Sequence, residues 1–374
     1  MARALQRNGG NADSADGADG ADGADGVAAR VVAWQRQHGR HHLPWQGTQD
    51  PYRVWLSEVM LQQTQVSTVL NYYARFLQRF PDVAALAAAS LDDVLALWSG
   101  LGYYSRARNL HRCAQAVVVM HGGQFPRTAA ALATLPGIGQ STAAAIAAFC
   151  FAERVAILDG NVKRVLTRLL GFDADLARAA NVATLWRHAQ DLVPAQHAAA
   201  YTQGLMDIGA TLCSVRQPEC ARCPLESLCA AHAAGTPERF PVKTRTLKRS
   251  RRSNAWLWLQ HGHRLWLVQR PATGVWAGLW SLAEFDSLED AQSWVGSWPG
   301  QGEVLASFRH TLTHFDWTLQ PLRWRLPALG QRAADSAAAG LAAQGPGRWV
   351  SLDEALLLGL PAPLRKLLLA QGQR

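Results

Sequence analysis

A single carboxylate interrupts an apolar segment near the N-terminal end of the chain. Glu58 is the only charged residue between Arg53 and Arg75, and it lies in Val54–Leu61, whose pattern predicts a helix that is apolar on most sides. A carboxyl that is desolvated there would keep its proton near neutral pH and act as a proton donor. The structural alternative is a narrow solvated stripe along the helix.

A second carboxylate, Asp159, lies at a boundary between elements. It ends the apolar run Val155–Leu158 and precedes Gly160-Asn161 at the start of a predicted helix. Asp-Gly-Asn at this place is typical of a helix N-cap. The functional alternative is a carboxylate that the helix entry holds rigidly beside a bound ligand.

A glycine-containing turn can supply that ligand's binding site. Leu135-Pro136-Gly137-Ile138-Gly139 joins two helical stretches, and Gln140-Ser141-Thr142 opens the second one. Gly137 and Gly139 allow backbone N–H groups to converge at a helix N-terminus, which attracts an anion and grips phosphate without reading bases. A tight turn without function is the alternative. If the turn binds DNA, Asp159 would lie close to the sugar of a bound nucleotide.

Four cysteines follow one another within seventeen residues: Cys213, Cys220, Cys223 and Cys229. Four thiolates at this density can surround one metal centre. Disulfides and zinc are the alternatives, but nothing suggests an oxidising compartment, and structural zinc usually takes two close Cys pairs where this loop has one. The uneven spacing favours one cube-shaped [4Fe-4S] cluster.

Two kinds of periodicity divide the chain that must position these residues. Up to about residue 231, apolar residues recur at helical spacing and Pro and Gly mark the joins, which predicts an irregular all-α unit. The predicted helices are Val27–His38, Val54–Phe76, Leu91–Trp98, Leu110–Met120, Ala143–Phe151, Val162–Leu170 and Tyr201–Leu212.

Beyond residue 254 the period changes to two, and ten of the fifteen tryptophans lie there, which predicts an α+β domain. Trp256 to Leu267 reads as a hairpin around His261-Gly262-His263. The other predicted elements are strands at Val304–Arg309, His314–Leu319 and Leu322–Leu326 and helices at Leu288–Val295 and Pro361–Leu369.

Four segments are predicted from these patterns: a disordered Ala-Asp-Gly-rich tail (1–26), the all-α domain (27–231), a basic linker (232–253) and the α+β domain (254–374). The linker has seven basic and no acidic residues from Arg239 to Arg252, so it is either a solvated tether or a segment that lies on a polyanion. The formal net charge is +9, and because the tail contributes −3, the rest of the chain carries +12. This balance favours a polyanionic partner.

The motifs together resemble the helix-hairpin-helix DNA glycosylases with an iron–sulfur loop, and most closely the adenine DNA glycosylases of the MutY type. The resemblance runs from about Arg36 to the C-terminus. It implies a multidomain fold in which an all-α helix-hairpin-helix core with a cluster loop precedes an α+β, Nudix-like domain. Its most specific segments are Leu43–Trp45, Trp55–Thr64, Gly100–Arg106, Leu135–Thr142, Leu158–Asn161 and the cysteine loop.

The resemblance also implies an activity, in which adenine paired with 8-oxoguanine or guanine is flipped out of the duplex and its glycosidic bond is hydrolysed. Glu58 matches the family's general acid, which protonates adenine at N7. Asp159 matches the carboxylate that stabilises the positively charged sugar, and Asn161 would help to hold it.

Other positions match residues that contact DNA in relatives. Gln63 and Tyr103 match residues that wedge into the base stack beside the oxidised guanine, although an exposed amide and a packed aromatic ring are the structural alternatives. Gln203 stands where relatives place a contact to the adenine edge. Ser141 replaces the catalytic Lys of endonuclease III-like relatives, and since a hydroxyl cannot form a Schiff base, a monofunctional glycosylase is predicted.

The C-terminal domain resembles a lesion reader. Arg309 to Phe315 resembles the family loop that inspects 8-oxoguanine, and Leu312-Thr313-His314 stands where many relatives have Phe-Ser-His. An edge strand over the same seven residues is the structural alternative. Gly278 and Glu284 begin a possible Nudix box, but Gln292–Ser297 stands where metal-binding glutamates are expected. Without them magnesium has no site, so we predict a binding module and no nucleotide hydrolysis.

The predicted partner is double-stranded DNA with adenine opposite 8-oxoguanine or guanine, bound by a monomer without membrane contact. No apolar run of eighteen residues and no secretory signal occur, which predicts a cytoplasmic, nucleoid-associated bacterial protein, with a nuclear or mitochondrial one as the alternative. Two other functions stay open: an endonuclease III-like lyase on oxidised pyrimidines, and a non-catalytic iron–sulfur DNA-binding protein.

Overall fold

The computed structural model describes residues 18–244, 248–327 and 331–372. Most of the predicted tail, residues 1–17, lies outside this range. Helix α1 (Ala18–His38) begins inside the Ala-Asp-Gly repeat, so residues 18–26 differ from the predicted disorder. Each residue added to an existing helix gains a hydrogen bond, which offsets part of the cost of Gly20, Gly23 and Gly26 in this segment.

The chain divides into two compact units that are each discontinuous in sequence. Unit 1 lies within residues 1–50, 127–130 and 139–245, and unit 2 lies within residues 51–126, 131–138 and 246–374. The predicted all-α segment therefore contributes helices to both units. Hydrophobic periodicity cannot reveal such a division, because it reports which face of a helix is buried and not which neighbour buries it.

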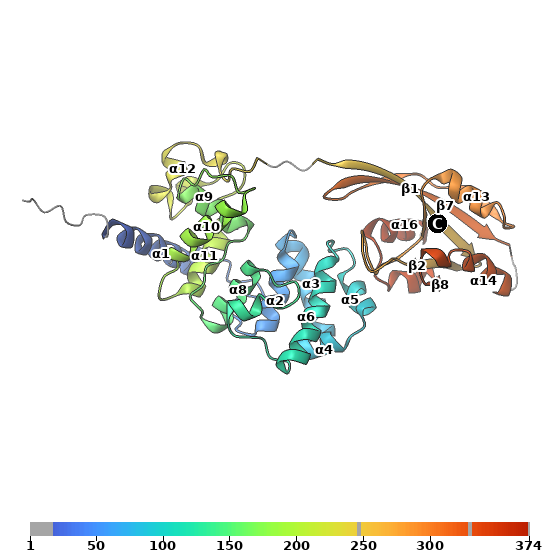
Figure 1. Cartoon of the computed structure of the whole chain (residues 1–374), viewed down its shortest axis with the longest axis horizontal. Helices are drawn as coiled ribbons and strands as arrows, with labels where there is room; N and C mark the ends of the chain where they lie inside the picture. The colour runs from blue at the N-terminus through green and yellow to red at the C-terminus, as the bar shows by residue number, and fades with distance from the viewer. Residues whose placement is uncertain (1–17, 245–247, 328–330, 373–374) are drawn as a thin grey trace, which may run out of the picture. The chain divides into compact units, whose positions relative to one another are not determined.

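Unit 1 is helical. Its core forms where α1 and α9 pack on α11, and Val31, Leu166 and Ile208 are fully buried there. The longer helices after α1 are α8 (Gln140–Phe151), α9 (Gly160–Leu169), α10 (Ala179–Asp191) and α11 (Ala198–Thr211) (Figure 1). The short elements η1 (Cys220–Arg222), η2 (Glu226–Leu228), α12 (Ala230–Ala233) and η3 (Pro237–Arg239) follow. No helix in the described ranges is both long and apolar enough to cross a membrane.

Unit 2 begins with five helices: α2 (Pro51–Leu61), α3 (Val66–Arg79), α4 (Val83–Ala88), α5 (Leu91–Trp98) and α6 (Ser105–His121). Helix α6 packs against α2, α4 and α5. The continuous helix predicted over Val54–Phe76 is wrong, because the chain leaves the helix after Leu61 and Gln63 adopts a left-handed φ of 56°. The short helix α7 (Ala129–Leu132) comes just before the glycine turn.

The C-terminal part of unit 2 is a mixed eight-stranded sheet with helices, which confirms the predicted α+β class. The long strands β1 (Ser250–His261) and β7 (Phe315–Leu326) pair in parallel along their whole length. The path of the sheet is β3-β2-β1-β7-β5, with β4 on β1, β6 on β7 and β8 on β2. The remaining strands are β2 (Arg264–Gln269), β3 (Trp280–Ser281), β4 (Ala283–Phe285), β5 (Gln301–Val304), β6 (Phe308–Thr311) and β8 (Gly347–Ser351).

Four helices accompany the sheet: α13 (Leu288–Val295), α14 (Gln331–Ala339), α15 (Leu352–Leu356) and α16 (Ala362–Gly372). Helix α13 packs against β1 and β7 (Figure 1), and its bounds are those predicted from periodicity. A buried cluster that includes Leu257, Leu259 and Leu322 forms the core under it.

The boundary between the helical and the sheet segments differs from the prediction. Strand β1 starts at Ser250, so the last residues of the predicted linker are part of the sheet. Its first residues, Ser250 to Ser253, are exposed, whereas Ala255 to Leu259 are buried. Periodicity detects only the buried part, because the exposed part has no apolar alternation.

Candidate active site and cysteine loop

Asp159 is the N-cap of α9, as the Asp-Gly-Asn pattern predicts. Its Oδ1 accepts a 2.7 Å hydrogen bond from the backbone N–H of Val162, and the side chain is half-buried. Burial raises the pKa of this carboxyl, although the hydrogen bonds from Val162 and Asn161 and the nearby Arg164 act against the rise. The helix entry thus presents a rigid, partly desolvated carboxylate.

Helix α9 connects this carboxylate to the cysteine loop. The Asn161 Oδ1 accepts a hydrogen bond from Arg164 at 2.9 Å, and the Arg164 Nε donates to the backbone carbonyl of Cys213 at 2.7 Å. A side chain at Gly209 of α11 would come within 2.7 Å of the Asn161 Cβ, so glycine is needed for this close packing. Unit 1 therefore brings Asp159, Asn161 and the first cysteine into one connected structure.

The four predicted ligand cysteines line one cavity. Cys213, Cys220, Cys223 and Cys229 are all half-buried, and Arg168, Glu226 and His232 are also in the lining. Among the described residues, no group of three or more His, Cys, Asp or Glu is arranged to hold a single metal ion.

Arg168 forms hydrogen bonds to several groups of this loop. It is 2% exposed, and it donates to the Cys213 Sγ at 3.2 Å and to the carbonyls of Ser214 and Pro237, both at 2.7 Å. Burial and the negative charge of the other three cysteines together raise the pKa of the Cys223 thiol to about 11, although a backbone hydrogen bond from Leu225 acts against the rise. Four thiols that repel one another when ionised need a cationic centre to be stable as ligands.

Glu58 lies in the middle of α2, a helix in which Val54 to Ser57 and Val59-Met60 are buried. Glu58 itself is half-buried, so it belongs to neither the core nor a fully solvated stripe. Glu58 belongs to unit 2, whereas Asp159 belongs to unit 1.

The glycine turn has the backbone that its sequence predicts. Gly137 has a φ of 76°, and a Cβ at this position would come within 2.5 Å of the Asn109 Cβ. Both the backbone angle and the lack of space therefore require glycine at this position. Gly139 is the N-cap of α8 and has no side chain with which to cap it. Of the next residues, Ser141 is half-buried and Thr142 is buried.

Gln63 and Tyr103 lie on two loops of unit 2 and share two features. Both are solvent-exposed, and both have a left-handed backbone, with φ of 56° for Gln63 and 48° for Tyr103. Such angles are uncommon for residues other than glycine, and they persist only where neighbouring groups hold them.

Arg106 is the group that holds both loops. Its NH1 donates to the carbonyls of Val59, Met60 and Gln62 at 2.7–2.8 Å, and its NH2 donates to the Thr64 hydroxyl and to the carbonyls of Leu101 and Gly102 at 3.1–3.3 Å. Burial lowers the pKa of this guanidinium to about 10, so it stays charged. Arg106 is not among the sequence-predicted site residues. The sequence feature that points to Arg106 is its position on the buried stripe of α6, one turn before Leu110.

Gln203 is half-buried on α11 and is oriented by a carboxylate. Its Nε2 donates to the Asp207 Oδ1 at 3.0 Å. Asp207 is fully buried and forms a 2.7 Å ion pair with Arg40. Because a carboxylate only accepts hydrogen bonds, this contact fixes which end of the Gln203 amide faces it.

The loop between β6 and β7 carries Leu312, Thr313 and His314. Thr313 and His314 are exposed, and Leu312 is half-buried. The loop is closed by the Leu312 N–H, which donates to the Phe315 carbonyl at 2.9 Å. The strand alternative for Arg309 to Phe315 is correct for Arg309 to Thr311, which lie in β6, and for Phe315, which begins β7, whereas residues 312–314 connect the two strands.

The carboxylates of the predicted Nudix box can be located in the structure. Glu284, its first glutamate, is paired with Arg270 at 2.7 Å. Helix α13 carries Gln292 and Ser293 in its second half, and neither supplies a carboxylate.

Comparison with known proteins supports both segments. A model described as an HhH-GPD superfamily base excision DNA repair protein matches residues 56–188, and a NUDIX domain model matches residues 254–370. A solved thermostable thymine-DNA glycosylase superposes on 57% of this chain and 98% of its own, with a TM-score of 0.52 and 26% identity.

The curated relatives extend along most of the chain. An adenine DNA glycosylase of Buchnera aphidicola subsp. Acyrthosiphon pisum is 34% identical over 341 residues, which are 90% of this chain and 95% of that protein. The adenine DNA glycosylase of Homo sapiens is 34% identical over 418 residues, covering 92% of this chain and 74% of that protein. With relatives of this identity and coverage, an HhH-GPD segment and a NUDIX segment, the chain belongs to the adenine DNA glycosylase family, a family of DNA N-glycosylases.

Proposed function

We propose that this protein hydrolyses the glycosidic bond of adenine paired with 8-oxoguanine or guanine in double-stranded DNA, without cleaving the strand. The observation that carries the proposal is Asp159, a carboxylate that a helix entry holds in a partly desolvated place within a chain of this family. The bond is unreachable in a stacked duplex, so the adenine must first be extruded.

Asp159 and Glu58 have different tasks in this reaction. Glu58 protonates the leaving adenine, and a positioned acid contributes about 10²–10⁴-fold to such a step. Asp159 stabilises the positive charge that develops on the sugar when the bond breaks, and Asn161 helps to hold the carboxylate through a hydrogen bond from its backbone N–H. Because Val162 donates to Asp159 Oδ1, the carboxylate keeps its orientation as the charge develops.

The DNA-binding residues are proposed from the elements on which they lie. The turn at Gly137 and Gly139 binds a phosphate through the uncapped N-terminus of α8, with Ser141 and Thr142 in its first turn. Gln63 and Tyr103 enter the base stack from their two exposed loops, and Gln203 contacts the flipped adenine. Leu312, Thr313 and His314 inspect the opposite base.

The four cysteines hold one [4Fe-4S] cluster. Support comes from the four half-buried thiols, which line one cavity together with Arg168. When bound, the cluster would supply a rigid anionic core for the loop, and the Arg168 contact to Cys213 would orient one ligand. The protein acts as a monomer.

The test is single-turnover release of adenine from a duplex with adenine opposite 8-oxoguanine, for the wild type and Asp159→Asn. Parallel reactions carry an oxidised pyrimidine, and alkali is added to half of each sample. We expect release that depends on Asp159 and strand breaks only after alkali. Direct nicking at the pyrimidine would instead indicate a lyase, and binding without release by a protein with full iron content would indicate a non-catalytic DNA-binding protein.

A further inference from the structure

The last residues of the basic segment before the NUDIX domain, from Ser250 to Arg252, are part of the sheet. Arg251 and Arg252 lie in β1, and they pair in register with Asp316 and Trp317 of β7. On the other side of β7, Arg309 of β6 pairs with Thr318. The ends of β1, β7 and β6 thus form a three-stranded ribbon that leads to the loop at residues 312–314.

The two faces of this ribbon differ in chemistry. Phe315, Trp317 and Leu319 of β7 are buried, whereas Thr318 between them is exposed. Residues paired across neighbouring strands point to the same side of a sheet, so Arg251 and Arg309 both lie on the open face with Thr318. Both arginines are exposed. Arg252 belongs to the other face, where its guanidinium lies 4.2 Å from the centre of the Phe315 ring.

The open face is fixed to the loop. The Arg249 guanidinium donates to the Leu312 carbonyl at 3.1 Å, and the Ser250 N–H donates to the His314 carbonyl at 3.1 Å. The acidic residue on this face, Asp316, accepts a 2.9 Å hydrogen bond from the Thr311 hydroxyl. The face therefore has two arginines, one hydrogen-bonded carboxylate and hydroxyl groups, and hydrogen bonds connect its edge to the loop.

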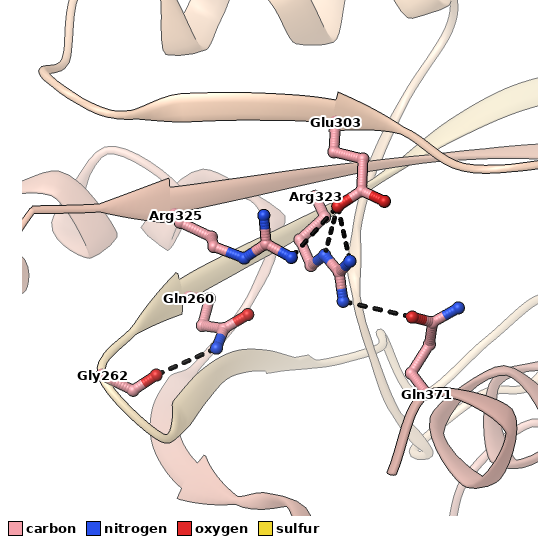
Figure 2. Close-up of polar contacts among 6 residues, drawn as sticks. All are labelled: Gln260, Gly262, Glu303, Arg323, Arg325 and Gln371. Carbon is pink, nitrogen blue, oxygen red and sulfur yellow. Dashed lines mark hydrogen bonds and ion pairs between the residues drawn. The ribbon is translucent and has the colours of Figure 1, made fainter. Parts of the chain in front are cut away.

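At the opposite end of the same sheet, the arginines form ion pairs with a carboxylate. Figure 2 shows that Arg323 and Arg325 of β7 both point to the Glu303 carboxylate, and Arg323 also contacts Gln371. Within the described ranges, by contrast, neither Arg251 nor Arg309 has a carboxylate at ion-pair distance. One end of the sheet neutralises its positive charge, and the loop end leaves it open to an external anion.

We propose that the open face formed by Arg251 and Arg309 binds the phosphate backbone of the DNA duplex beside the base that the 312–314 loop inspects. Strands β1 and β6 lie on either side of β7, about 10 Å apart, so the two arginines would contact separate phosphates. These contacts position the loop on the duplex and carry no base information. The proposal rests on the proposed function, because it assigns the DNA contact of the same protein.

The test compares three single substitutions that each remove one positive charge: Arg251→Ala, Arg309→Ala and, as the matched control, Arg325→Ala at the other end of the sheet. Equilibrium binding of a duplex with adenine opposite 8-oxoguanine is measured by fluorescence anisotropy across a range of salt concentrations. The same series is repeated with adenine opposite guanine. Adenine release under single-turnover conditions is measured at saturating protein.

The logarithm of the association constant falls linearly with the logarithm of the salt concentration. The slope of this line should become shallower by about 0.9 for Arg251→Ala and for Arg309→Ala, because each phosphate contact on B-DNA contributes that amount. It should stay unchanged for Arg325→Ala. The loss of affinity should be equal for the two duplexes, and the saturated release rate should not change. Equal slopes for all four proteins would overturn the proposal even if adenine is released. A wild type that binds with the expected slope but releases no adenine would contradict the proposed function and leave this contact intact.

Discussion

The helical segment and the NUDIX segment use charged side chains in opposite ways. In the helical segment Arg106, Arg168 and Asp207 are buried, and each organises backbone or side-chain groups around it. In the NUDIX segment Arg251 and Arg309 are exposed at the end of a sheet. The first arrangement fixes atoms in place, and the second offers charge to a partner.

The cysteine loop and the Nudix box differ in the same way. The cysteine loop keeps four thiols around one cavity, with Arg168 beneath them. The Nudix box keeps Glu284, but Arg270 neutralises it. Chemistry requires fixed and partly desolvated groups, whereas recognition of DNA requires groups that solvent and ligand can reach. Substitutions in the helical segment should therefore have larger effects than those in the NUDIX segment.

The largest effect is expected for Asp159→Asn. Asparagine caps helices as well as aspartate, so α9 and the melting temperature should be preserved. The charge that faces the sugar is lost, and single-turnover adenine release should fall by about 10³-fold. Asp173→Asn, at an exposed aspartate of the same unit, is the control. A release rate within tenfold of the wild type would remove Asp159 from the mechanism.

The pH dependence of release should follow the same carboxylate. Burial raises the pKa of Asp159, so the group takes up a proton at a higher pH than an ordinary aspartate. Release should decline about tenfold per pH unit as the pH falls through this raised pKa, because the protonated form carries no charge. The measurement is the single-turnover rate from pH 4 to pH 8, with the fraction of folded protein checked at each point. An acid limb at or below about pH 4, the ordinary range for aspartate, would contradict the prediction.

Arg106→Met tests the buried network itself. Methionine keeps the apolar stem, but it leaves the carbonyls of two loops without a donor, so the free energy of unfolding should fall by about 3 kcal/mol in urea denaturation. Arg112→Met, on the exposed side of the same helix, should change it by less than about 0.5 kcal/mol. If the two variants are equally stable, the loops at Gln63 and Tyr103 do not depend on Arg106.

A smaller effect is expected in the NUDIX loop. Replacement of His314 by alanine removes an exposed imidazole from the lesion-inspecting loop, and it should reduce the preference for 8-oxoguanine over guanine by about tenfold, the value of one base contact. His263→Ala, an exposed histidine in the β1–β2 turn, should not change the preference. Competition binding with the two duplexes measures both. An unchanged ratio in His314→Ala would assign the discrimination to other residues.

No effect at all is expected from magnesium in the NUDIX domain. Since Arg270 holds Glu284 and α13 supplies no carboxylate in its second half, nucleoside triphosphates incubated with the protein and Mg²⁺ should remain intact. Glu284→Gln should behave as the wild type does in this assay. Phosphate release that disappears in Glu284→Gln would show that the box retains activity.

The amino-acid sequence by itself determined the local features of this protein. The bounds of α5 and α13, the N-cap at Asp159 and the glycine turn at Gly137 follow from residues adjacent in the chain. Helix periodicity, capping and left-handed turns depend on the nearest few residues, and they can be inferred without knowledge of the fold.

Tertiary structure decided what depends on distant neighbours. Periodicity does not reveal the break after Leu61, because Arg106, more than forty residues away, supplies the donors that hold it. It does not reveal the strand that contains Arg251 either, because an exposed strand is recognisable only through its partner β7. A buried arginine and an exposed strand both violate the rule that apolar residues mark the elements, and only the arrangement of the whole chain supplies the hydrogen bonds that stabilise them.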